Sequence, residues 1–184
     1  MCTMKTTLII ISILIFAFAA IQLYTMSATN GTERQVYKTI LEGGKLEVRF
    51  YPTSTIASVT KRGDFEAMSS AGFQDLAGYI FGGNIQNQKI AMTSPVIMEG
   101  QEEQTKMSFV MPSKYKMEDL PLPNSSNVTF SQTEPVYMAT VTFGGFSNET
   151  KNQENKTKLL EWLAQKGIKH KQKHVLFTYN PPYQ

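Results

Sequence analysis

Cysteine and histidine are nearly absent from this chain, which has one cysteine and two histidines among 184 residues. Because the cysteine is Cys2, the body of the protein has no disulfide framework, no CxxC pair and no cysteine ligands for a metal. His170 and His174 are four residues apart in an apparent strand, a separation of about 13 Å, so they cannot share a metal ion. We therefore expect no metal site.

The common catalytic motifs are also absent. The chain has no Gly-x-Ser-x-Gly elbow, no His-Glu-x-x-His and no phosphate-binding loop, and its carboxylates show no pairing for acid-base chemistry. The net charge is only +3, with basic residues dispersed among acidic ones, so composition does not indicate a nucleic-acid partner. These absences favour a binding protein that is neither an enzyme nor a nucleic-acid reader.

The long apolar run of the chain lies at the N-terminus, over residues 8–26. If only residues 8–20 form the hydrophobic region of a secretory signal peptide, Ala17-Phe18-Ala19 is its cleavage site. If the apolar segment extends to residue 26, it approaches the roughly 20 residues that a membrane anchor needs. Both alternatives predict an exported protein that is secreted, periplasmic or lumenal, or anchored by this segment. The expected organisation is a signal peptide or membrane anchor over 1–26, a linker over 27–34 and a single domain over 35–184.

Five Asn-x-Ser/Thr sequons agree with export through a glycosylating pathway, whereas an unglycosylated polar-loop composition is the alternative. Asn155 is the poorest acceptor because it lies four residues before Leu159, on the same face of a predicted helix as a core residue. The glycosylation candidates are Asn30, Asn124, Asn127 and Asn148.

From residue 33 onward, the chain alternates predicted strands with two helices. Two strand-like runs within 36–51 flank Gly43-Gly44, a dipeptide typical of tight hairpins, and a third strand follows. An apolar stripe predicts a helix over 64–81, capped by Asp64, and strands over 89–99 and 105–112 come next. The strand over 89–99 contains Pro95, which cannot donate a backbone hydrogen bond and should interrupt regular pairing.

A second series repeats this order, with a strand over 136–143, a helix over 149–165 and a strand over 173–182. It lacks a counterpart of the strand over 105–112. By this internal symmetry the second unit stops one strand short, and we expect an exposed, unpaired edge where the missing strand would lie.

The segments KIAMTSPV, YIFGGN, LEVRFY, FGGF and YNPP together resemble the SOUL, or heme-binding protein, family over residues 36–183. The resemblance implies an α+β fold, a twisted antiparallel β-sheet or barrel flanked by two helices. It also implies a duplicated β-α-β-β unit, here apparently lacking the last strand. The implied function is non-enzymatic binding of heme or a related tetrapyrrole in an apolar cleft. We expect a monomer that meets a membrane only through its N-terminal segment.

Two features depart from the family pattern. Family members continue past the YNPP stretch into a strand with an Arg-Asn-Glu core, whereas this sequence ends at Gln184, which raises the expectation of a truncated chain. They also carry basic residues on or near the first helix, whereas residues 64–84 contain no lysine or arginine. We therefore expect heme binding to be mainly apolar and only weakly salt-dependent.

The expected cleft lies between the first helix and the strand that carries Pro95. Helix periodicity and strand alternation direct apolar side chains of both elements toward each other, and methionines supply adaptable contacts for a flat ligand, with core packing as the alternative. The candidate ligand-binding residues are Met68, Phe73, Leu76, Ile80, Ile90, Met92 and Met138.

Other interpretations stay open. Either histidine alone could bind heme iron, or both could be solvated strand-end residues. Lys169, Lys171 and Lys173 form a basic row that could meet a carboxylate, a phosphate or a lipid head group, or deter strand pairing. The alternative function is a protein-interaction module whose exposed edge binds a peptide or partner strand without heme.

Overall fold

The chain divides into two compact units, Met1–Thr32 and Glu33–Gln184, in a computed structural model. In the first unit the described residues within 11–18 are helical, Thr32 lies at a bend, and Asn30 is outside the described residues. No helix among the described residues is long and apolar enough to span a bilayer. The structure describes residues 11–13, 15–16, 18, 32–62, 65–101, 104–145 and 147–179.

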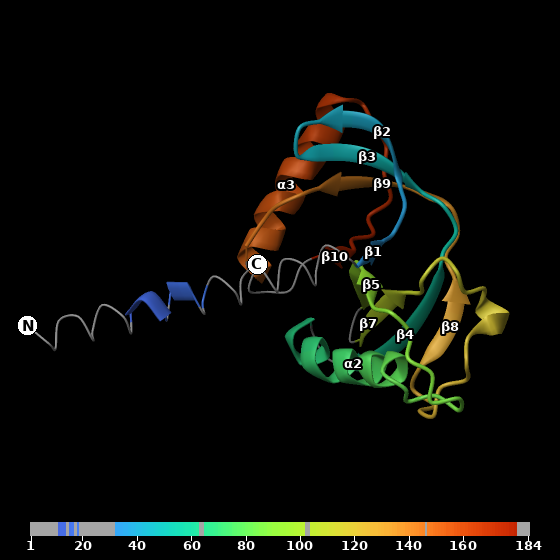
Figure 1. Ribbon diagram of the computed structural model, residues 1–184. Coiled ribbons are helices and arrows are strands. Elements are labelled where there is room, and N and C mark those ends of the chain that lie inside the picture. Colours follow the sequence, from blue (N-terminus) through green and yellow to red (C-terminus); the bar gives the residue numbers. More distant parts are fainter. Residues whose placement is uncertain are drawn as a thin grey trace, which may run out of the picture. The chain divides into compact units, whose positions relative to one another are not determined.

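A three-stranded antiparallel sheet forms one part of the second unit (Figure 1), in the order β2-β3-β9. Gly44 closes the β2–β3 hairpin at a φ of 73°, a conformation that glycine adopts without strain, so the predicted hairpin is confirmed. The helix α3 packs on β9, and Asn148 caps it by accepting a hydrogen bond from the Lys151 amide at 2.9 Å. The elements are β2 (Lys38–Gly43), β3 (Leu46–Tyr51), β9 (Val136–Val141) and α3 (Glu149–Gln165).

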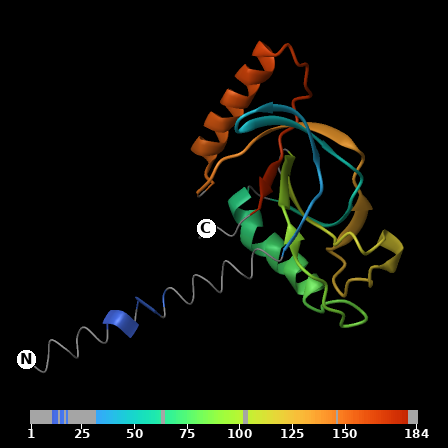
Figure 2. The ribbon, with the colours of Figure 1, turned by 45° about the horizontal axis from the view of Figure 1, so that its top comes forward.

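A five-stranded antiparallel sheet in the order β10-β6-β7-β4-β8 forms the other part. The helix α2 packs on β4 and β7, so each of the two larger sheets has its own helix (Figures 1 and 2). The elements are β4 (Thr55–Arg62), α2 (Phe65–Ile80), β6 (Val96–Gln101), β7 (Gln104–Val110), β8 (Thr129–Gln132) and β10 (Leu176–Thr178). Short elements complete the chain: β1 (Glu33–Arg34) pairs in parallel with β5 (Thr93–Ser94), and η1 is Met117–Asp119.

The core lies between α2 and the five-stranded sheet, because the apolar stripe of the helix faces alternating apolar positions of the strands. Removing these side chains from water stabilises the fold by about 25 cal/mol per Å² of apolar surface. The core cluster consists of Ala57, Val59, Leu76, Tyr79, Ile80, Ile90, Met98, Met107, Phe109, Met111, Leu120 and Val128.

The predicted fold class is confirmed: the molecule is α+β, with twisted antiparallel sheets and two flanking helices in the second unit. The sheets of the described residues do not close into a barrel. The helix predicted over 149–165 has those bounds, and the one predicted over 64–81 spans Phe65–Ile80, with Asp64 outside the described residues.

Two predicted strands need correction. Of the strand predicted over 173–182, the part that the structure describes, 173–179, is a strand only over Leu176–Thr178, so His170 and His174 lie in an irregular segment before it rather than in a strand. The strand predicted over 89–99 has irregular backbone over 89–92, where Ile90 instead donates its N–H to the last helical residue, Ile80.

Pro95 interrupts its strand as predicted. The Ser94–Pro95 peptide is cis, β5 ends at Ser94, and β6 begins at Val96 with different neighbours. Since proline has no N–H to donate, the break falls where a ladder bond could not form.

The two series differ in how their last described strands are paired. In the first, β7 lies between β6 and β4. In the second, β10 and β9 each form the edge of a sheet, and no described strand lies between them. Among the described residues, β9 and β10 are thus edge strands, as are β2 and β8.

Candidate ligand-binding surface

The structure brings three of the seven predicted ligand-binding residues together in the core. Leu76 and Ile80 of α2 and Ile90 of the segment after it are buried in the core. The Ile90 amide donates to the Ile80 carbonyl at 2.8 Å, which fixes the segment after the helix against the helix end. These side chains are packed against protein atoms and support the surface rather than form it.

Phe73 and Met92 are the accessible members of the predicted set, each 37% exposed. The Phe73 ring contacts the Phe109 ring of β7 edge-on, with centroids 5.4 Å apart. Phe73 precedes Leu76 by three residues and so shares a helix face with it, while Met92 immediately precedes β5. We call these two accessible apolar side chains the α2 surface.

Met138 lies in the other sheet, where it is half-buried on β9 opposite Arg49. The structure does not bring it into the core cluster with Leu76. Met68 is in α2, but its side chain lies outside the described residues.

The sequence did not predict a cluster around Arg49 of β3. The guanidinium lies 4.2 Å from the centre of the Tyr37 ring, and its nitrogens donate to the Glu47 carboxylate, the Tyr51 hydroxyl and the Thr142 hydroxyl. Burial opposes the charge, but hydrogen bonds with Tyr51 and Glu47 outweigh it and raise the pKa of Arg49. The sequence feature that could have predicted this cluster is the alternation in LEVRFY, which places Glu47, Arg49 and Tyr51 on one face of a strand.

This cluster connects the two sheets. The Tyr51 ring packs against the Phe177 ring of β10 with centroids 5.6 Å apart, and burial, together with the neighbouring Tyr51 hydroxyl, raises the pKa of Tyr179. Arg49 is only 8% exposed and its donors are used internally. The cluster is therefore a structural junction between β3 and β10 rather than an open anion site.

The histidines lie close together in the irregular segment before β10. Burial, with the positive charges of Lys156 and His170, lowers the pKa of His174 and favours its neutral imidazole. Among the described residues, no group of three or more His, Cys, Asp or Glu side chains could hold a metal ion. Of the predicted basic row, Lys173 pairs with Glu99 of β6 at 2.7 Å.

The sequons differ sharply in accessibility. Asn124, Asn127 and Asn148 are exposed. Asn155 is 9% exposed and its Nδ2 donates to the Lys151 carbonyl at 2.8 Å, so it lies on the buried side of α3, as its spacing from Leu159 predicts.

Residues 32–184 match the family described as SOUL heme-binding protein. The chain belongs to the SOUL heme-binding protein family. Heme-binding protein 2 of Mus musculus is 30% identical over 151 residues, covering 77% of this chain and 73% of that protein. Heme-binding protein 2 of Homo sapiens is 31% identical over 149 residues, covering 76% and 72%.

The SOUL fold of this chain also resembles a solved structure with a different title. A crystal structure of a hydrolase from Listeria innocua superposes with a TM-score of 0.53 at 11% identity, covering 83% of this chain and 89% of that one. At this identity the likeness shows the shared fold alone.

Proposed function

We propose that this SOUL domain binds heme or a related tetrapyrrole without catalysing a reaction. The observation that carries the proposal is family membership over residues 32–184, and the names of the mouse and human relatives support it. Tetrapyrroles are flat and largely apolar, so a binding surface needs accessible apolar side chains on a rigid support.

The α2 surface meets this requirement. Phe73 and Met92 are accessible, and the buried Leu76, Ile80 and Ile90 hold the helix and the following segment in place behind them. Charge has the smaller role, because α2 contains no lysine or arginine and the nearby Lys61 already pairs with Asp75 at 2.8 Å. The heme carboxylates would then point to solvent, and affinity would depend weakly on salt.

A heme titration that follows the Soret band tests this placement. Met92→Glu and Phe73→Glu place a charge on the α2 surface at positions exposed enough to preserve the fold, and we expect each to weaken heme binding at least tenfold, about 1.4 kcal/mol. Ile40→Glu is the matched control, because Ile40 is a 50% exposed apolar residue on β2 of the other sheet. Equal affinity in all three folded variants would contradict the assignment of the α2 surface.

The hydrogen-bond pattern of the sheet edges favours a second candidate function, binding of an extended peptide. The Thr142 backbone amide donates to the Lys45 carbonyl at 2.8 Å. This bond continues the β3–β9 pairing by one residue, so Lys45 and Thr142 form a hydrogen-bonded pair. Because bonded pairs alternate in antiparallel ladders, the N–H and C=O groups of Tyr137, Ala139 and Val141 point away from β3. A strand added there would use these groups.

Selection of peptides from a displayed random library against the purified protein tests this candidate. Ala139→Pro removes one outward N–H without removing a bond to β3, and Ala139→Ser is the control that keeps it. Peptides that bind the serine variant and not the proline variant would support strand addition. Failure to select any edge-dependent peptide would count against it.

We also propose that the protein is exported by its N-terminal apolar run over residues 8–26. Fractionation of cells that express the full chain tests this proposal. Intact chain recovered in the cytosolic fraction would refute it.

A further inference from the structure

Two loops hold large apolar side chains in water at the end of α2. Ile85 and Leu122 are each 62% exposed. They face each other across a short antiparallel contact, because the Ile85 amide donates to the Leu122 carbonyl at 3.0 Å and the adjacent Asn84 and Pro123 form a β-bridge. Opposite residues in such a pair have Cβ atoms about 5 Å apart, so the two side chains form one apolar patch.

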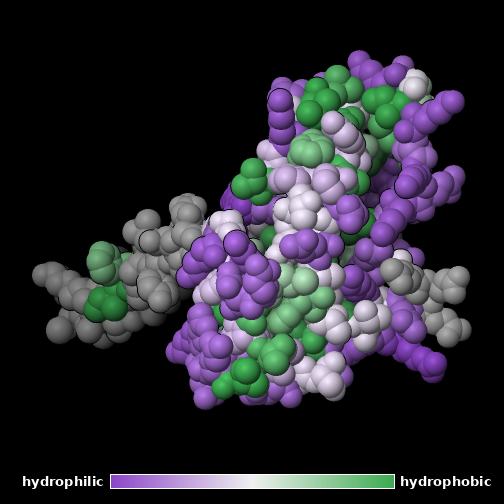
Figure 3. All heavy atoms as spheres, turned by 90° about the vertical axis from the view of Figure 1, so that its right-hand side faces the viewer, coloured by the Kyte–Doolittle hydropathy of each residue, from purple (hydrophilic) through white to green (hydrophobic). Residues whose placement is uncertain are grey.

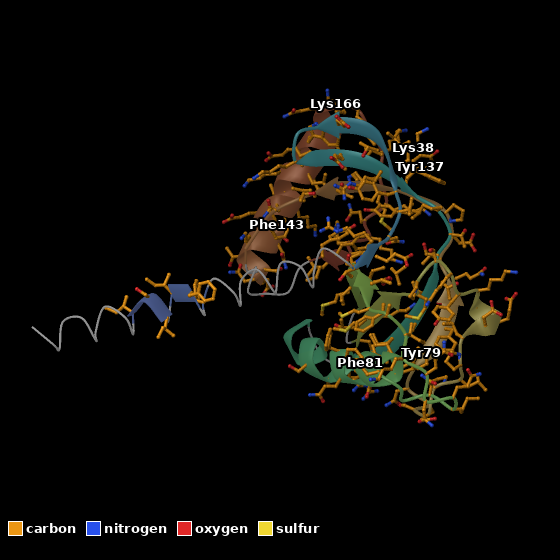
Figure 4. All side chains as sticks on the ribbon, in the orientation of Figure 1. Lys38, Tyr79, Phe81, Tyr137, Phe143 and Lys166 are labelled. Carbon is orange, nitrogen blue, oxygen red and sulfur yellow. The ribbon has the colours of Figure 1, made fainter. Side chains whose placement is uncertain are left out.

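Phe81, also 62% exposed, directly follows the last residue of α2 (Figure 4). It precedes Ile85 by four residues. Green apolar residues gather at the lower end of the face drawn in Figure 3, the end at which Figure 1 shows α2 and the loops beside β8. Exposed apolar groups that lie together, rather than scattered singly, indicate that something covers them.

The patch is built on a rigid base. The side-chain Nδ2 of Asn84 donates to the Tyr79 and Gln88 carbonyls at 3.1 and 2.8 Å. The Tyr79 hydroxyl donates to the Pro121 carbonyl at 3.1 Å. These bonds fix both loops against the core. Ile85 and Leu122 therefore cannot turn inward to escape water without breaking the bonds beneath them.

The same contact places Asn124 beside the patch. The Asn124 backbone amide donates to the Gly83 carbonyl at 3.0 Å. Asn124 therefore lies opposite Gly83 in the same antiparallel pairing in which Ile85 lies opposite Leu122. Since side chains alternate along an extended chain, Asn124 lies on the face of Leu122, while Asn84 lies on the opposite face. The burial agrees, because Asn84 is buried and Asn124 is exposed.

Asn124 begins the sequon Asn124-Ser125-Ser126. We propose that Asn124 carries an N-linked glycan whose first sugars cover the Ile85–Leu122 patch. The Asn124 Nδ2 forms a bond to the anomeric carbon of a lipid-pyrophosphate-linked oligosaccharide and loses one proton, and the lipid pyrophosphate leaves with the electron pair of the broken C–O bond. The C–H faces of the sugars pack on the apolar side chains while their hydroxyls stay in water.

This inference rests on the proposed export, which supplies the lipid-linked donor, and is independent of heme binding. Asn155 is the sequon expected to stay unmodified, because its side chain is buried and its Nδ2 already donates to the Lys151 carbonyl. Asn127 is the matched exposed sequon on the same loop, at a position beyond the paired register.

The experiment expresses the full chain in glycosylating secretory cells and maps glycopeptides by mass spectrometry. We expect glycan on the Asn124 peptide and none on the Asn155 peptide. Binding of a hydrophobic dye should rise about twofold in Asn124→Gln, should not rise in Asn127→Gln, and should return to the starting level in Asn124→Gln with Leu122→Ser.

An unmodified Asn124 overturns the proposal, whether other sequons are occupied or not. Occupied Asn127 or Asn148 in that case would leave export standing and reject only the glycan at the patch. Unchanged dye binding in Asn124→Gln would show that the glycan does not cover the patch, and a dimer that dissociates on Leu122→Ser would assign the patch to a second copy. Heme titration of the same variants separates either failure from a failure of the proposed function.

Discussion

Asn84 is the residue on which the loop after α2 depends most, and its replacement by alanine gives a quantitative test. Its side chain is 1% exposed and makes four hydrogen bonds, two donated by Nδ2 to the Tyr79 and Gln88 carbonyls and two accepted by Oδ1 from the Gln86 and Gln88 amides. At about 1 kcal/mol each, their loss would cost about 4 kcal/mol. Because only the bond to Tyr79 is fully buried, water can replace part of the others, and we expect a loss of roughly 2–3 kcal/mol.

Urea denaturation followed by far-ultraviolet circular dichroism measures this loss. The matched control is Gln86→Ala, because Gln86 is an exposed neighbour whose backbone amide still donates to Asn84, and it should change the free energy of unfolding by less than about 0.5 kcal/mol. If Asn84→Ala behaved like the control, the hydrogen-bond network would not be the base of this loop. The rigid display of Ile85 and Leu122 would then lose its physical basis.

Three further predictions concern packing and pH. Gly83→Ala would place a Cβ 2.6 Å from the Gly78 carbonyl oxygen, a backbone atom, and should destabilise the domain by about 1–3 kcal/mol in thermal denaturation. Gly43→Ala would place a Cβ 2.8 Å from Nε1 of Trp162 and should shift the tryptophan fluorescence because the ring must move. The lowered pKa of His174 means that the unfolded state takes up the proton first, so the free energy of unfolding should fall as pH drops below 6.5, and fall less in His174→Gln.

The candidate site shows where prediction from sequence reaches its limit. Helix periodicity correctly placed Leu76 and Ile80 on the side of α2 that faces the sheet, whereas Ile90 is buried although the strand alternation that placed it is absent from the irregular backbone over 89–92. It could not separate side chains that line a surface from those sealed beneath it, because both classes repeat at the same spacing. Only the tertiary packing distinguished the accessible Phe73 and Met92 from the buried residues.

The Arg49 cluster and the Ile85–Leu122 patch needed the tertiary structure for a different reason. Each joins segments distant in the chain: Tyr51 meets Phe177, and Ile85 pairs with Leu122. Contacts between distant segments depend on how the sheets and loops dock, and a local pattern carries no record of that docking.

The sequence by itself determined the local elements of this protein. It specified the hairpin at Gly44, the helix over 149–165 and the interruption at Pro95, because glycine conformation, capping and a missing N–H act within a few residues. The tertiary structure alone decided which strand edges stay unpaired, which methionines reach solvent and which sequon asparagine lies beside an apolar patch. These properties depend on burial and register between distant segments, which exist only once the chain has folded.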